Sequence, residues 1–213
     1  MPPPKPEIDP ERISMSTNIV MIWLLSLNGP ILLDGQAVQS APFSGEPVMA
    51  GQAHEGRVAV IVKGQQIWVR ERGTWVLWAE SDLNLNCLAW TPDGRLLVGT
   101  ARARLAWVER HGLSFIGSFD AVEGRKDWNT PWGGPPDVRS LAVATDETLY
   151  ANIHVGWIVR SRDGGKTWKN LRRGLDKDVH MVAARPREPN IVFCATARGF
   201  HYSDDHGDTF SPA

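Results

Sequence analysis

Two eight-residue segments near the C-terminal end of the chain repeat one pattern of turn-forming residues. Residues 161–168 and 203–210 both read S-x-D-x-G-x-T-[WF], and the second segment begins 42 residues after the first. The matching positions are Ser161, Asp163, Gly165, Thr167 and Trp168, then Ser203, Asp205, Gly207, Thr209 and Phe210. A repeat of this length predicts a series of similar supersecondary units stacked on one another.

Two weaker copies lie upstream. Gly112-Leu113-Ser114-Phe115 keeps the glycine, hydroxyl and aromatic residues but has Arg110 in place of the aspartate, and Gly73-Thr74-Trp75 is fainter still. The aromatic positions 75, 115, 168 and 210 are separated by 40, 53 and 42 residues. We therefore expect repeat units over residues 19–213 that end near these four positions.

The residues that precede each motif alternate between short apolar runs and turn residues, which is typical of β-structure. No stretch shows sustained helical periodicity. The expected strands are residues 87–91, 95–100, 105–108, 140–144, 148–153, 158–160, 181–184, 191–196 and 200–202. The sequence thus predicts an all-β fold, a β-propeller of four-stranded antiparallel blades with about four to five blades present.

The two full motifs resemble the Asp-box, or BNR, repeat of sialidase-like β-propellers, sortilin-type receptors and photosystem-assembly-factor-like proteins. The resemblance spans roughly residues 58–210 and is strongest in the last two units. It implies a hairpin between the third and fourth strands of each blade. Aspartate accepts hydrogen bonds from turn amides, and glycine supplies a backbone conformation that other residues avoid. We expect Asp163 and Asp205 to hold turns, not to take part in catalysis or metal binding.

Closure of the ring is a separate question, because propellers of this family usually contain more blades. The chain continues for only three residues after Phe210, so we expect the last blade to lack its outer strand. Either the apolar run 19–27 completes that blade, or the chain is an incomplete ring or a fragment of a longer propeller. That run is too short to span a bilayer and is predicted to be a strand. Residues 1–18 are rich in proline and charge and are expected to be disordered.

Bulk charge excludes some partners. Lysine and arginine number 23 against 24 acidic residues, so we expect neither nucleic acid nor a membrane as partner. No basic flank precedes the apolar run, which favours a cytoplasmic location. Cys87 and Cys194 lie in apolar runs and are expected to be buried thiols, instead of forming a bridge or a reactive site. We expect no cofactor.

The register of the repeats directs the search for a site to the opposite edge of the blades, where loops converge on the channel mouth. The innermost strands place Asn86, Arg139 and His180 in equivalent positions, each preceded two residues earlier by a polar residue. Those preceding residues are Asn84, Asp137 and Asp178. Residues two apart on a strand point the same way. They either line the channel mouth or cap strand ends and pair with one another.

Three further segments would border the same opening: the longest connection, the segment that contains Asn152 and His154, and the segment that contains Arg198. The longest connection, residues 119–136, contains Glu123, Arg125, Asp127, Trp128 and Trp132. It is either a ligand-binding lid or a packed connector whose indoles cover a blade edge. Candidate ligand-binding residues outside it are Arg139, Asn152, His154, His180 and Arg198.

One further cluster resembles a metal site. It contains His201, Asp204, Asp205, His206 and Asp208, but strand alternation sends these side chains in different directions, and we expect no metal there.

A sialidase would need an arginine cluster and an activated tyrosine. The Arg-Ile-Pro signature of that family is absent, and Tyr150 and Tyr202 lie in expected strands. A different glycoside hydrolase would use paired carboxylates, for which Glu123, Asp127, Asp137 and Asp178 are the candidates. No complete catalytic set is visible. The sequence therefore favours a noncatalytic module that binds a carbohydrate or protein ligand at the channel mouth, with a glycoside hydrolase as the alternative.

Overall fold

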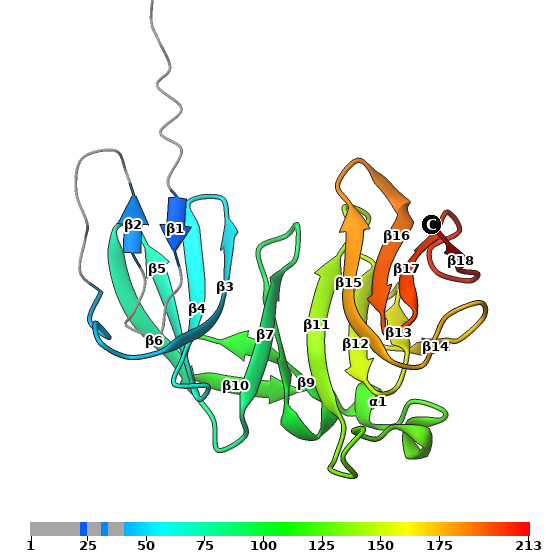
Figure 1. Cartoon of the computed structure of the whole chain (residues 1–213). Coiled ribbons are helices and arrows are strands. Elements are labelled where there is room, and N and C mark those ends of the chain that lie inside the picture. Colours follow the sequence, from blue (N-terminus) through cyan, green and yellow to red (C-terminus); the bar gives the residue numbers. More distant parts are fainter. Residues whose placement is uncertain (1–21, 25–30, 34–40) are drawn as a thin grey trace, which may run out of the picture.

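The computed structural model describes residues 22–24, 31–33 and 41–213. The expected disordered lead-in over residues 1–18 lies outside them. Four sheets of four antiparallel strands follow one another along the chain, and in each sheet the strands are ordered by sequence. Figure 1 shows the sheets side by side along an open arc. The predicted all-β architecture of four-stranded blades is confirmed, with four blades among the described residues.

The strands have the following bounds. Blade 1 contains β3 (Val48–His54), β4 (Arg57–Val62), β5 (Gln66–Glu71) and β6 (Thr74–Glu80). Blade 2 contains β7 (Leu85–Trp90), β8 (Leu96–Thr100), β9 (Arg104–Glu109) and β10 (Gly112–Phe115). Blade 3 contains β11 (Asp137–Val143), β12 (Leu149–His154), β13 (Ile158–Ser161) and β14 (Lys169–Leu171). Blade 4 contains β15 (Val179–Arg185), β16 (Glu188–Thr196), β17 (Gly199–Ser203) and β18 (Ser211–Pro212).

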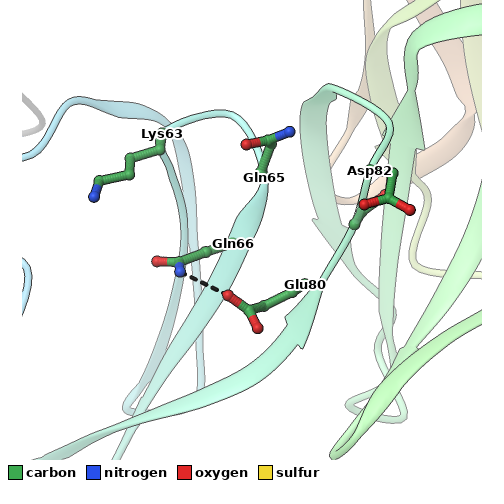
Figure 2. Close-up of a pocket in the computed structure, with 6 residues that line it drawn as sticks. Lys63, Gln65, Gln66, Glu80 and Asp82 are labelled. Atoms are coloured by element: carbon green, nitrogen blue, oxygen red, sulfur yellow. Dashed lines mark hydrogen bonds between the residues drawn. The ribbon is translucent and has the colours of Figure 1, made fainter.

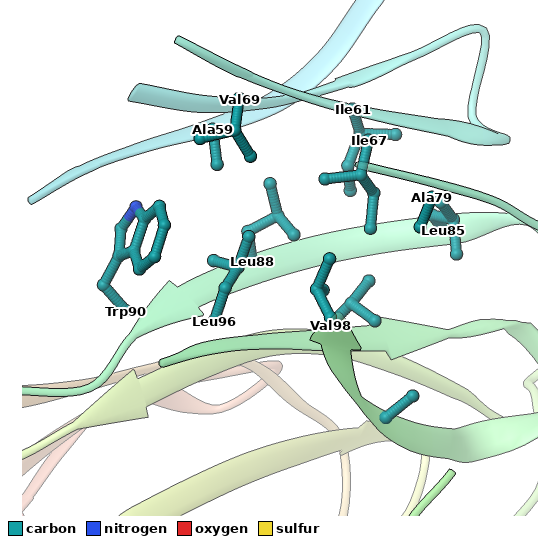
Figure 3. Close-up of a cluster of buried hydrophobic side chains, with 12 residues drawn as sticks. Ala59, Ile61, Ile67, Val69, Ala79, Leu85, Leu88, Trp90, Leu96 and Val98 are labelled. Carbon is teal, nitrogen blue, oxygen red and sulfur yellow. The ribbon is translucent and has the colours of Figure 1, made fainter. Parts of the chain in front are cut away.

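Apolar side chains between adjacent blades form the core, and the inner strands β3, β7, β11 and β15 follow one another along the arc. Between blades 1 and 2, Ile61 and Ile67 pack with Leu88 in a cluster that is shielded from water (Figure 3). Blades 2 and 3 approach each other closely at Gly99. A Cβ atom on Gly99 would lie 2.7 Å from the Cys87 Sγ atom and nearer to the Val138 side chain. Face-to-face packing therefore fixes how the blades sit relative to one another.

The two full motifs form the expected hairpin turns between the third and fourth strands. In blade 3 the Ser161 side chain is 1% exposed, and its Oγ accepts a hydrogen bond from the Gly165 N–H (2.9 Å) and donates one to Asp163 Oδ1 (2.8 Å). Asp163 Oδ1 in turn accepts from the Thr167 N–H (2.9 Å), and Gly165 adopts a φ of 89°. The carboxylate therefore serves the turn, as expected.

Blade 4 repeats this network. Ser203 Oγ accepts from the Gly207 N–H (2.8 Å) and donates to Asp205 Oδ1 (2.6 Å), which also accepts from the Thr209 N–H (2.9 Å). The aromatic residue of each motif then packs the turn inward. The Trp168 indole donates to the Gly165 carbonyl (3.1 Å), and the Phe210 ring is buried.

The expectation that the last blade lacks its outer strand is wrong. β18 pairs with β17 through His201↔Pro212 and Tyr202↔Ser211, so blade 4 has four strands. The strand escaped prediction because two residues show no alternation, and proline is compatible only with an edge strand. The described part of the run 19–27, β1 (Ile22–Leu24), does not join blade 4 but pairs with β2 (Ile31–Leu33). The rest of the run lies outside the described residues.

The weak copy around Phe115 lacks the aromatic anchor that the motif pattern suggested. Phe115 is the last residue of β10, its side chain is 37% exposed, and the Arg104 guanidinium lies 3.9 Å from the ring centroid. Trp168 and Phe210, by contrast, precede their outer strands and pack inward. Without an aspartate at Arg110, residues 109–112 form an ordinary hairpin connection between β9 and β10.

Both cysteines are free and buried, as expected, and burial raises the pKa of the Cys87 thiol to about 12. Thiols in such surroundings behave as small apolar groups. Within the part of the chain that the structure describes, no helix has the length and apolar character needed to cross a membrane.

We predict that Ser161→Ala destabilises the fold by about 1–3 kcal/mol, because the change leaves the buried Gly165 N–H without its acceptor. The free energy of unfolding, measured by urea denaturation, tests this. Ser114→Ala, at an exposed position in β10, is the matched control and should change that free energy by less than about 0.5 kcal/mol. Equal effects of the two changes would contradict the role given to the motif serine.

The Asp163 turn also predicts a pH dependence. The Thr167 hydroxyl and amide lower the pKa of Asp163 to about 2, whereas an unfolded aspartate has a pKa near about 3.9. A lowered folded-state pKa means that the contribution is complete above the unfolded value and is lost as the pH falls through the folded one. Thermal stability should therefore decline between about pH 4 and pH 2.

The same melting series on Asp163→Asn should show a smaller decline over this interval. Asp82→Asn, at an exposed carboxylate between β6 and β7, is the control and should follow the wild type. An Asp163→Asn profile that parallels the wild type would refute the assignment.

Candidate functional site

Each inner strand begins with a β-bulge at an equivalent place. The register shifts fall between Val48 and Ala50, Leu85 and Cys87, Val138 and Ser140, and Val179 and Met181. The extra residues are Met49, Asn86, Arg139 and His180. A bulge bends a strand and re-aims the side chain of its extra residue, and such bulges concentrate at barrel rims and active sites. We infer that the fold presents one variable side chain per blade at the channel mouth.

Three of these four residues line a single pocket. It has a volume of about 360 Å³ and is built from the first three blades and the connection that precedes β11. Its lining residues are Met49, Leu85, Asn86, Trp132, Asp137, Arg139 and His154. We call it the mouth pocket. The sequence had indicated five of these seven as site candidates or their neighbours, and it missed Met49 and Leu85.

The missed residues carry a recognisable signal. A buried aliphatic residue precedes each bulge position: Val48, Leu85, Val138 or Val179. This signal places Met49 in register with Asn86. The sequence alignment of the inner strands began at Asn84 and did not include residues 48–54, which form the inner strand of blade 1.

His154, at the end of β12, lies between the mouth pocket and blade 4. Its side chain is 8% exposed, and its Nε2 atom lies 3.3 Å from Asp178 Oδ1. Burial and the nearby Arg139 guanidinium lower the pKa of His154, while the Asp178 carboxylate acts in the opposite direction. The ring is therefore neutral near pH 7 and presents a nitrogen lone pair.

Trp132 is the most exposed large apolar side chain of the described residues, at 74%. A tight turn holds it in place, because Thr130 Oγ1 accepts from the Gly134 N–H (2.6 Å) and the Thr130 carbonyl accepts from the Gly133 N–H (3.0 Å). Its ring centroid lies 5.6 Å from that of His154. The indole is thus a positioned platform at the rim of the mouth pocket.

The long connection divides into two parts with different roles. Its first part forms α1 (Gly117–Asp120) and η3 (Arg125–Asp127) and is a packed connector. Trp128 is buried with its ring centroid 5.8 Å from that of Phe119, and Asp127 pairs with Arg172 at 3.2 Å.

Arg125 lies in the same first part of the connection. Its Nη2 atom donates to the Arg102 carbonyl (3.0 Å), and its guanidinium carbon lies 4.9 Å from the Trp128 ring centroid. Glu123 is exposed and does not line the mouth pocket. Of the candidates on this connection, only Trp132 reaches the pocket.

The remaining candidates lie at different depths in the molecule, one in the interior and one at the rim. Asn152 lies two residues below His154 on the same face of β12 and is fully buried, where its Nδ2 atom donates to Ser140 Oγ (3.2 Å). That oxygen also accepts from the Val182 N–H (3.0 Å), so Asn152 helps to join blades 3 and 4. Arg198 is at the rim of blade 4, where it pairs with Asp176 at 2.9 Å. Neither residue lines the mouth pocket.

Two other cavities are less suited to a specific ligand. One of about 360 Å³ lies beside the β4–β5 turn and is lined by polar groups such as Gln66 and Glu80, which bond to each other at 2.8 Å (Figure 2). The other, of about 800 Å³, lies at the hairpin edge of blades 1 and 2 and contains the Arg110–Glu71 ion pair (3.4 Å). In the mouth pocket an exposed indole and the charged Asp137 and Arg139 of blade 3 lie with side chains of blades 1 and 2.

The C-terminal histidine and aspartate cluster is committed to other contacts. Asp208 pairs with Arg160 (3.1 Å) and Lys169 (2.7 Å), and His206 lies 3.7 Å from Asp146. Within the described segments, a different group brings three ligand atoms within 4.8 Å of one another: His154, Asp178 and His180.

Comparisons with known proteins identify the fold. No protein-family model matches the chain, and no curated protein matches it in sequence. Among solved structures, it matches the extracellular domain of BT4673 from B. thetaiotaomicron, a proposed one-component system, with a TM-score of 0.62 and 12% identity. An ancestral GH74 enzyme matches with a TM-score of 0.59 and 14% identity, and YCF48 bound to D1 peptide with 0.62 and 18%.

These matches cover much of this chain but only part of the other proteins. They cover 86%, 78% and 90% of this chain, and 26%, 24% and 63% of the BT4673, GH74 and YCF48 chains. The chain thus spans about a quarter of two larger propellers and under two thirds of the third. These matches show that the chain has the β-propeller fold, and its two full motifs resemble the Asp-box (BNR) repeat.

Proposed function

We propose that the chain is a noncatalytic binding module that takes a glycan or a protein segment at the channel mouth. The observation that carries this proposal is the exposed Trp132 indole beside Arg139 in a pocket built by three blades. Tryptophan and arginine dominate the energetics of binding interfaces. An indole presents a large flat surface for the apolar face of a sugar ring or a side chain.

Arg139 adds a polar contact to this platform. Its guanidinium offers two parallel N–H donors that match a carboxylate. The Asp137 carboxylate and the neutral His154 ring lie in the same lining. Since the pocket volume is at the small end of ligand sites, we propose that it receives one part of a larger ligand that continues over the rim. The ligand chemistry is an apolar face that carries a hydrogen-bond acceptor.

The known structures support this proposal at the level of the fold. The YCF48 match is a complex with D1 peptide, so a protein with a similar arrangement of blades binds a peptide. The BT4673 match is the extracellular domain of a proposed one-component system.

One observation favours a glycoside hydrolase as the second candidate. Of the four candidate carboxylates, Asp137 lines the mouth pocket and Asp178 lies against His154, while Glu123 and Asp127 belong to the connector. A GH74 enzyme is also among the matches. Hydrolysis of a panel of aryl glycosides that is lost in Asp137→Asn would establish this candidate instead of the binding module.

We predict that Trp132→Ala and Arg139→Ala each weaken binding at least about tenfold, as truncation of a central interface anchor does. The probes are a glycan array and an immobilised peptide library, followed by calorimetry with the best hit. Phe200→Ala and Arg187→Ala remove an exposed aromatic and an exposed arginine elsewhere and should bind like the wild type. Binding that survives both mouth changes would refute the proposed site.

A further inference from the structure

Three side chains converge where blades 3 and 4 meet at the channel mouth. His154 ends β12, Asp178 precedes β15, and His180 is the bulged residue of β15. His154 Nε2 lies 3.3 Å and His180 Nε2 lies 3.4 Å from the same atom, Asp178 Oδ1. All three ligand atoms lie within 4.8 Å of one another.

These separations suit a shared cation better than direct pairing. Hydrogen bonds from a nitrogen to an oxygen are about 2.7–3.2 Å long, and both histidine contacts to Asp178 are longer. Asp178 Oδ1 is buried and has no hydrogen-bond partner. A buried carboxylate oxygen without a partner carries a large desolvation cost.

Tetrahedral coordination accounts for the spacing. Zinc binds histidine nitrogen and carboxylate oxygen at about 2.0–2.2 Å, which puts neighbouring ligand atoms about 3.4 Å apart. The two nitrogen-to-oxygen separations match this edge. The two histidine nitrogens lie within 4.8 Å of each other, and His180 is exposed, so rotation of its side chain would bring them to the same spacing.

Backbone contacts hold Asp178 in place relative to the blade that carries His154. The Asp178 N–H donates to Asp176 Oδ1 (2.8 Å), and the Lys177 carbonyl accepts from the Trp157 N–H (3.0 Å) of blade 3. The loop before β15 is thus tied to the blade that carries His154. Preorganised ligands of this kind lower the entropic cost of binding.

The charges around the three groups also suit a cation. The Asp178 carboxylate supplies the negative charge of the site, and Asp137 adds a second one nearby, against the single positive charge of Arg139.

From this geometry we propose that His154, Asp178 and His180 form a binding site for a divalent transition-metal ion, with zinc as the first candidate. Two imidazoles and one carboxylate select zinc, nickel or copper over calcium or magnesium, which prefer oxygen ligands. Three protein ligands leave at least one coordination position for water or a ligand atom. This site goes beyond the proposed binding function and does not depend on it.

The test uses the full chain without a histidine tag, stripped of metal with a chelator. Cobalt(II) titration followed by visible absorption reports the coordination number, and zinc titration followed by calorimetry reports affinity and stoichiometry. We expect one equivalent of each metal to bind, with the intense visible bands of four-coordinate cobalt. His180→Ala and Asp178→Asn should each weaken zinc binding at least about tenfold, since even changes to residues behind the ligands cost 10–100-fold.

His111→Ala changes an exposed histidine on the β9–β10 hairpin and should bind zinc like the wild type. The His180 side chain is 43% exposed, so its removal tests the site without disturbing the core. Circular dichroism melting of each variant without metal confirms that it is folded. Absence of one-to-one zinc binding, or equal affinity of His180→Ala, Asp178→Asn and the wild type, would overturn the proposal.

Discussion

A buried serine hydroxyl in the hairpin between the third and fourth strands is the interaction on which the two C-terminal blades depend. The hydroxyl oxygens of Ser161 and Ser203 each accept a hydrogen bond from the N–H of the motif glycine and donate one to the motif aspartate. The turn thereby satisfies polar groups that would otherwise be buried without partners. It also positions Trp168 or Phe210 to pack inward.

The same turn connects neighbouring blades. In blade 4 the carbonyl of His206, inside the motif, accepts hydrogen bonds from Arg160 (2.7 Å) and Tyr150 (3.2 Å) of blade 3. In blade 3 the Gly165 carbonyl accepts from Ser118 (2.5 Å) on the connection from blade 2. Each motif therefore stabilises its own hairpin and the packing angle to the blade before it. This leaves the opposite ends of the strands free to vary.

At those strand ends, the side chains that differ between blades lie at one repeated structural feature, the β-bulge of each inner strand. All four inner strands carry a bulge at the same position, but the extra residues are methionine, asparagine, arginine and histidine. The same bulge recurs in every blade, while the side chain that it presents differs. The fold can therefore stay the same while the site changes, since function resides in the site that a fold carries. The mouth pocket and the His154–Asp178–His180 group both follow from this arrangement.

The repeated blades and strand starts were predictable from the sequence. The depth of single side chains and the packing of the long connection were not. The spaced motifs predicted the blades, and alignment of the inner strands predicted Arg139 at the mouth. The position of His154 between the second and third strands of its blade predicted this residue at the same opening. Depth was not predictable, since Asn152 and His154 share one face of β12 and differ only in how far they lie from the rim. Each half of the connection contains one tryptophan, and the sequence did not predict which is buried: Trp128 packs on Phe119, while Trp132 is held outside by a tight turn.

The central claim is that ligands bind at the bulged strand ends and that the motif hairpins hold the fold. Hydrogen–deuterium exchange of the full chain, with and without the ligand selected from the glycan array or peptide library, tests it most directly. The account predicts slowed exchange at residues 129–140 and 153–157 on ligand addition, with no change at residues 163–168 and 205–210. Slowed exchange confined to the two motif hairpins would contradict it.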